Sequence, residues 1–179
     1  DVVGYNYLEA RMLSDHKKFP ERRFLVTEEL PYYCGAEGNI RSYDTNNPWN
    51  IIAENDFIAG GFLWTGTDYI GEAGWPSHGW PAGLFDICMV EKPRAAFHRA
   101  MWNDKPMVRI AVRDNALDID HGRDLWQWPN MAAIWNFPRA YEGLVIEVNT
   151  TTNCERVALF HNGNEMGVRR TADYPNHTI

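Results

Sequence analysis

Cysteine is scarce in this 179-residue chain, and no pair of cysteines has the spacing of a metal site. Cys34, Cys88 and Cys154 lie far apart, and neither a CxxC pair nor a Cys/His spacing accompanies them. We therefore predict neither a bound metal nor any other cofactor. An odd number of cysteines leaves a free thiol or an intermolecular disulfide, so the redox compartment stays open.

Excess positive charge is also missing, because 17 lysines and arginines stand against 24 acidic residues, giving a net charge of −7. Without a basic run to receive phosphates, a nucleic acid or an anionic membrane is not the expected partner. The longest apolar run is far shorter than the roughly 20 residues of a membrane-spanning helix. An initiator methionine and a leader are absent, and the opening "DVVGYNY" already has the composition of a strand. We therefore expect a piece of a longer protein.

Aromatic residues are abundant, with eight tryptophans and eight tyrosines in a chain that is 45% hydrophobic. That hydrophobic content is enough to bury a sizeable core, in one domain or two small ones. Most buried aromatics simply supply core area. Flat aromatic faces can also stack on the apolar face of a sugar ring, so both interpretations remain open at this point.

The first 105 residues alternate strand patterns with helix patterns. Apolar β-forming runs alternate with segments of helical character, and glycine- and proline-rich loops follow the second and third strands. The predicted strands are 1–7, 23–28 and 58–66, the helices 8–19, 49–57 and 91–102, and the loops 31–48 and 67–83. This order predicts parallel βα units.

The pattern changes from about residue 106, where short β runs follow one another and no helix pattern intervenes. Runs at 107–112, 144–150 and 155–162 have turn residues between them, and "HNGNEMG" contains the Asn-Gly turn of a β-hairpin. We predict a β-sandwich domain over 106–179, incomplete at its end, after an α/β domain over 1–105.

Two adjacent glutamates end the strand in "FLVTEELP". Side chains alternate between the two faces of a strand, so Glu28 and Glu29 cannot point the same way. The two carboxylates should therefore lie in different environments.

Five segments together resemble glycoside hydrolase family 2, and its β-galactosidase-like members most closely. They are "DVVGYNY", "FPERRFLVTEE", "FIAGGFLWTGTDYIGE" with "GLFDICMVEKPRAAFHRAMW", and "EGLVIEVNTTTNCERVALFHNGNEMGV". They agree with the family in order and spacing over nearly the whole chain. The resemblance implies an α/β plus all-β fold: the last three βα units of a (β/α)₈ TIM barrel, then an immunoglobulin-like β-sandwich.

The resemblance also implies a retaining β-glycosidase, with β-galactosidase as the favoured activity. Glu28 aligns with the catalytic nucleophile at the end of a barrel strand, where such barrels place their chemistry. The acid/base glutamate belongs to an Asn-Glu pair on an earlier strand, and Asn164-Glu165 lies in a hairpin instead. The acid/base residue is therefore expected upstream of residue 1, and the chain alone is expected to be inactive.

Three further positions follow from the resemblance. Tyr7 aligns with a tyrosine that hydrogen-bonds the nucleophile, and Trp64 with the tryptophan that floors the sugar subsite, often followed by a non-proline cis bond. Asp68 is a candidate for binding a sugar hydroxyl, although loop aspartates often cap turns. Trp75, His78 and Trp80 either line an aglycone subsite or pack the loop, with packing the more common outcome.

Several alternatives remain open at the level of sequence. A β-glucuronidase or β-mannosidase of the same family is possible, although an Asn-x-Lys signature for a sugar carboxylate is absent. A non-catalytic carbohydrate-binding or scaffolding module would also suit the β-sandwich alone. The expected partners are a carbohydrate, and either the remainder of the parent chain or further copies in a homo-oligomer.

Overall fold

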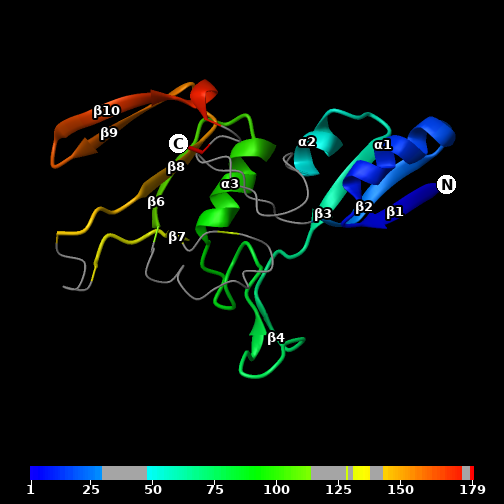
Figure 1. Ribbon diagram of the computed structural model, residues 1–179, viewed down its shortest axis with the longest axis horizontal. Helices are drawn as coiled ribbons and strands as arrows, with labels where there is room; N and C mark the ends of the chain where they lie inside the picture. The colour runs from blue at the N-terminus through cyan, green and yellow to red at the C-terminus, as the bar shows by residue number, and fades with distance from the viewer. Residues whose placement is uncertain (30–47, 114–127, 129–130, 138–142, 175–177) are drawn as a thin grey trace. The chain divides into compact units, whose positions relative to one another are not determined.

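The computed structural model of the chain describes residues 1–29, 48–113, 128, 131–137, 143–174 and 178–179 (Figure 1). They fall into two compact units: unit 1 holds 1–29 and 48–90, and unit 2 holds the described residues from 91 onward. Within these residues, none of the helices has the length and apolar character that crossing a bilayer requires. The loop predicted over 31–48 lies almost entirely outside the described residues.

Unit 1 is built on a three-stranded parallel sheet in the order β1-β2-β3. Helix α1 connects β1 to β2, and α2 immediately precedes β3 (Figure 1). The elements are β1 (Val2–Asn6), α1 (Glu9–Lys18), β2 (Arg23–Glu29), α2 (Pro48–Ala53) and β3 (Ile58–Leu63). The parallel βα arrangement predicted from the sequence is therefore present.

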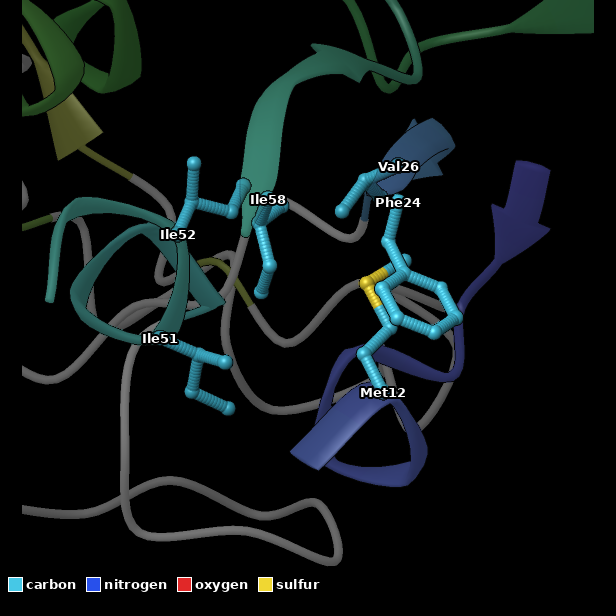
Figure 2. Close-up of a cluster of buried hydrophobic side chains, with 6 residues drawn as sticks. All are labelled: Met12, Phe24, Val26, Ile51, Ile52 and Ile58. Atoms are coloured by element: carbon cyan, nitrogen blue, oxygen red, sulfur yellow. The ribbon is translucent and has the colours of Figure 1, made fainter. Parts of the chain in front are cut away.

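The two helices of unit 1 pack their apolar residues against the sheet. Met12 of α1 lies against Phe24 of β2, and Ile52 of α2 lies near Ile58 of β3 (Figure 2). Each fully buried side chain of this size contributes roughly 1.5–3 kcal/mol to stability. The buried cluster is Met12, Phe24, Val26, Ile51, Ile52 and Ile58.

Helix α2 is shorter than the predicted helix over 49–57. The Asn55 side-chain amide donates a hydrogen bond to the Ile51 carbonyl at 2.7 Å and satisfies an acceptor at the helix end. The Ile58 N–H then donates to the Asn55 carbonyl at 2.9 Å, which turns the chain into β3. A local side-chain bond therefore competes with continued helix.

Strand β2 contains a β-bulge at Thr27. On the β1 side, Tyr5 pairs with Val26 and Asn6 pairs with Glu28, so Thr27 is the extra residue. Phe24 and Val26 point into the core, and regular alternation would send Glu28 there as well. The extra residue reverses the phase, so Glu29 enters the core and Glu28 turns to the other face.

A short antiparallel hairpin follows β3, within the segment predicted as a loop. Its strands are β4 (Tyr69–Ile70) and β5 (Gly79–Trp80), each only two residues long. Gly83 packs so closely against the start of this hairpin that a Cβ there would come 2.3 Å from the Asp68 nitrogen. The sequence did not predict this hairpin, because two-residue strands leave no alternating pattern.

Unit 2 combines one helix with antiparallel strands. Its three-stranded sheet has the order β7-β6-β8, and β9 and β10 form a separate hairpin. The predicted Asn162-Gly163 turn is present, with φ of 50° and 80°. The elements are α3 (Pro93–Trp102), β6 (Val108–Arg113), β7 (Met131–Ala132), β8 (Val148–Thr152), β9 (Arg156–His161), β10 (Asn164–Arg170) and the 3₁₀ turn Thr171–Asp173.

Helix α3 belongs to unit 2, whereas the predicted domain division at 105/106 assigns it to the first domain. It contacts β6 and β8, and the Asn153 side chain secures the segment after it. The Asn153 amide donates to the carbonyls of Asn103 and Lys105 at 2.7 and 2.8 Å, and its oxygen accepts from the Met107 N–H at 2.8 Å. Compact packing and domain membership need not coincide, so the domain division stays a prediction.

The end of the chain pairs with β8. Thr178 bridges Thr151, and Ile179 exchanges two backbone hydrogen bonds with Thr150 at 2.7 and 2.8 Å. These contacts pair residues 178–179 with β8, and residues 175–177 lie outside the described part.

Candidate functional site

The ends of β1 and β2 are joined through Tyr7 and Glu28. The Tyr7 hydroxyl donates a hydrogen bond to Glu28 Oε2 at 2.6 Å, and the Tyr7 N–H donates to the Glu28 carbonyl at 2.9 Å. Tyr7 has a φ of 58°, uncommon for a side chain other than glycine, asparagine or aspartate. The backbone at the end of β1 thus turns this ring toward the carboxylate that the bulge presents.

The environment of Tyr7 favours its neutral form. Burial, the hydrogen bond to Glu28 and the negative charge of Glu28 together raise the pKa of Tyr7 far above its usual value. The hydroxyl therefore remains a donor throughout the neutral range. This hydrogen bond holds one oxygen of the Glu28 carboxylate, and the other carboxylate oxygen remains available as a nucleophile.

Glu29 lies in the opposite environment. Only 1% of its surface is exposed, and a Cβ on Gly61 would come 2.6 Å from Glu29 Oε2, so only glycine fits beside it. Burial and the nearby charge of Glu9 raise the pKa of Glu29 to about 8. The carboxyl is therefore mostly protonated at pH 7, unlike what a nucleophile requires.

Trp64 stands at the end of β3 beside the same strand ends. Its backbone N–H donates to the Glu29 carbonyl at 3.0 Å, and its half-buried ring meets the Tyr69 ring edge-on at 6.0 Å. The Trp64–Thr65 peptide bond is cis, so that prediction is confirmed.

Tyr69 and Glu72 form a second tyrosine–carboxylate pair, in contact with Trp64 through the Tyr69 ring, and the sequence did not predict it. The Tyr69 hydroxyl donates to Glu72 Oε2 at 2.5 Å. Partial desolvation, the hydrogen bond and charge of Glu72 and the charge of Glu28 raise the pKa of Tyr69. A tyrosine and a glutamate three residues apart, shortly after the predicted subsite tryptophan, were the available signal.

Asp68 serves the loop that carries Tyr69. Its Oδ1 accepts a hydrogen bond from the Gly83 N–H at 2.8 Å, and its own N–H donates to the Phe85 carbonyl at 2.8 Å. These contacts fix the start of β4 against the segment that follows β5. The predicted role in binding a sugar hydroxyl stays a prediction.

The β4–β5 hairpin carries Trp75 and His78 at its tip. Trp75 is 88% exposed, and its ring meets the His78 ring edge-on at 6.0 Å. Trp80 instead pairs with Tyr69 across the hairpin. Trp80 is therefore part of the hairpin's own structure, and an aglycone role for Trp75 and His78 is still a hypothesis.

The resulting site is a carboxylate, Glu28, held by Tyr7 at the carboxyl ends of parallel strands, with the rings of Trp64 and Tyr69 in contact at the end of the next strand. Across the part of the chain that the structure describes, no three histidine, cysteine, aspartate or glutamate side chains gather as metal ligands would. The oriented Glu28 carboxylate can act as a nucleophile, and the aromatic rings can stack against the apolar face of a ring.

The known proteins that this chain resembles are named as glycosidases. No protein-family model matches it. It is 25% identical to a β-galactosidase of Bacteroides ovatus over 95% of its length, and 31% identical to a Formosa agariphila protein provisionally named a β-glucuronidase over 66%. The chain spans only 22% and 10% of the lengths of these two relatives.

A solved structure supports the same relationship. A member of glycosyl hydrolase family 2 from Bacteroides cellulosilyticus matches the whole of this chain with a TM-score of 0.82 at 29% identity, and the match covers 24% of that protein.

Proposed function

Since the chain belongs to glycoside hydrolase family 2, we propose that it supplies the nucleophile to a retaining β-glycosidase that acts on terminal β-linked galactose. Glu28 is the nucleophile, and Tyr7 is a positioning residue that orients it. The observation that carries the proposal is the 2.6 Å hydrogen bond between them at the carboxyl ends of parallel strands.

In the proposed reaction, a Glu28 oxygen attacks the anomeric carbon while the glycosidic bond breaks. A second carboxyl group, about 5–5.5 Å from the first, protonates the departing oxygen. The resulting ester between Glu28 and the sugar is then hydrolysed by water, which the second group deprotonates. We place this acid/base residue outside the 179 residues.

The proposed scaffold is the last part of a (β/α)₈ barrel followed by an immunoglobulin-like sandwich, divided near residue 105. The parallel order β1-β2-β3 is consistent with a barrel segment, and the antiparallel strands of unit 2 are consistent with a sandwich. In this arrangement Trp64 floors the sugar subsite and Asp68 binds a hydroxyl group near it.

A β-glucuronidase is the second candidate, because one relative carries that name. We favour a neutral sugar, since residues 42–91 contain neither lysine nor arginine to pair with a sugar carboxylate. A β-mannosidase fits the same chemistry. A non-catalytic carbohydrate-binding module would also use the Trp64 and Tyr69 rings, but it would show no turnover that Glu28→Gln could abolish.

Substitution of the two glutamates in the full-length protein tests the proposal. Glu28→Gln, nearly isosteric, should lower kcat on a chromogenic β-galactoside by several orders of magnitude, because no covalent intermediate can form. Glu29→Gln should have a mild effect. A 2-fluoro-galactoside with a good leaving group should label Glu28, as peptide mass mapping will show.

The matched pair also guards against a folding defect, since both variants should keep the wild-type circular dichroism spectrum. If Glu29→Gln abolished turnover while Glu28→Gln had a mild effect, or if a residue other than Glu28 were labelled, the assignment of the nucleophile to Glu28 would be wrong.

A further inference from the structure

We propose that Glu72, held by Tyr69 beside the Tyr7–Glu28 pair, binds hydroxyl groups of a neutral sugar and discriminates against glycosides of uronic acids. This inference deepens the proposed function and rests on it. It assigns a specificity role to a carboxylate, with a tyrosine as its positioning residue.

Unit 1 contains two carboxylate–tyrosine pairs. Tyr7 holds Glu28 at 2.6 Å, and Tyr69 holds Glu72 at 2.5 Å. The Tyr69 ring packs edge-on against Trp64 at 6.0 Å, which connects the second pair to the end of β3.

The charges of the two pairs interact as well. Besides burial and Glu28, the charges of Tyr69 and Glu72 contribute to the high pKa of Tyr7. The pKa of Tyr69 is raised mainly by partial desolvation and by Glu72, and the charge of Glu28 makes a smaller contribution. The two pairs therefore lie within electrostatic range of each other.

The second feature is the distribution of charge within unit 1. All lysines and arginines among its described residues lie on α1 or around the start of β2, and none lies in 48–90. They are Arg11, Lys17, Lys18, Arg22 and Arg23. The segment 64–90 carries Asp68, Glu72 and Asp86 and neither a lysine nor an arginine.

A uronate placed beside Glu28 would bring its own carboxylate close to this negative segment. Burying an anion without a cationic partner is costly, and a like charge nearby raises the cost. A neutral sugar instead offers hydroxyl donors, and a carboxylate has about four lone-pair sites. Tyr69 occupies one of them, and exposed Glu72 has capacity for sugar hydroxyls.

The test compares matched glycosides in the full-length enzyme. The p-nitrophenyl β-galactoside and β-galacturonide differ only at C6, as do the β-glucoside and β-glucuronide. Glu72→Gln should lower kcat/KM on the neutral member of each pair by about 10–100-fold, the loss of charge-assisted hydrogen bonds. The ratio of uronide to neutral turnover should rise at least about tenfold.

Two further variants separate specificity from stability. Tyr69→Phe should raise KM for the neutral sugars with a smaller change in kcat, because Glu72 loses its positioning donor. Glu21→Gln removes an exposed carboxylate of the same unit at the opposite end of β2 and should leave both ratios unchanged. Melting temperatures show whether any change reflects folding alone.

An unchanged ratio in Glu72→Gln, with both sugars reduced equally or not at all, would overturn the inference. If the wild-type enzyme hydrolyses none of the four glycosides, the proposed function fails. Binding of the same four compounds then decides the inference by itself: a wild-type preference for the neutral members that Glu72→Gln abolishes supports it, and equal binding by both proteins overturns it.

Discussion

At the scale of single residues, Glu28 and Glu29 show how neighbours of identical chemistry acquire different properties. Glu28 is half-buried and accepts a hydrogen bond from Tyr7, whereas Glu29 is buried against Gly61. Burial penalises a charged carboxyl, and only a strong donor or cation would offset that penalty. The end of β2 therefore presents one glutamate to Tyr7 and holds the other in its protonated form.

The buried position of Glu29 predicts a dependence of stability on pH. Its pKa is about 8 when folded and 4.5 ordinarily, so between these values the unfolded chain releases a proton that the folded protein keeps. The wild type should lose stability as pH rises through this window. Glu29→Gln should change the free energy of unfolding by less than about 1 kcal/mol at pH 5 and raise it by about 2–4 kcal/mol at pH 8.5.

Urea denaturation of both proteins at pH 5, 7 and 8.5 measures this difference. Glu21→Gln, which removes an exposed carboxylate in the turn before β2, is the control and should show no such trend. A difference between Glu29→Gln and the wild type that stays constant with pH would mean that Glu29 is already ionised in the folded protein.

At the scale of elements, hydrophobic periodicity predicted the framework of unit 1. Residues such as Met12, Phe24 and Ile58 recur at helix or strand spacing because they fill one core, so the pattern and the packing carry the same information. The resemblance supplied Glu28, Tyr7 and Trp64, whose positions relative to the strand ends agree with the geometry found.

The bulge and the β4–β5 hairpin could not be predicted in the same way. The bulge at Thr27 is a property of strand pairing, set by how β1 and β3 each align with β2, and no local pattern reports it. Tyr69 and Glu72 were missed for a related reason. Their contact depends on how the chain turns after β4, and the two-residue strands of this hairpin leave no periodicity in the sequence.

The connection from α3 to β6 yields a prediction for unit 2. Asn153 makes three hydrogen bonds of 2.7–2.8 Å to the backbone around this connection. Asn153→Ala removes all three and should lower the free energy of unfolding by about 1–3 kcal/mol, measured by chemical denaturation. Asn103→Ala is the control, because its amide makes only a weak 3.5 Å contact with Arg99, and it should cost less than about 0.5 kcal/mol. Equal losses in both variants would argue against this role of Asn153.

At the scale of the whole molecule, the chemistry of unit 1 collects at one end of its sheet. Tyr7 follows β1, Glu28 lies near the end of β2 and Trp64 follows β3, whereas Arg22 and Arg23 lie around the start of β2. Parallel strands bring residues distant in sequence to a common edge, which is why such edges carry active sites. Unit 2 contributes none of the residues assigned to this site.

We predict that the 179-residue chain is catalytically inactive by itself. Retaining hydrolysis needs a second carboxyl group about 5–5.5 Å from the nucleophile, and we place that group outside the chain. The purified chain should hydrolyse a chromogenic β-galactoside no faster than its own Glu28→Gln variant, in an assay where the full-length enzyme is active. Turnover that Glu28→Gln abolishes would contradict this, because an acid/base residue would then lie within these residues. Glu72, the carboxylate that Tyr69 holds beside the Tyr7–Glu28 pair, would be the first position to substitute.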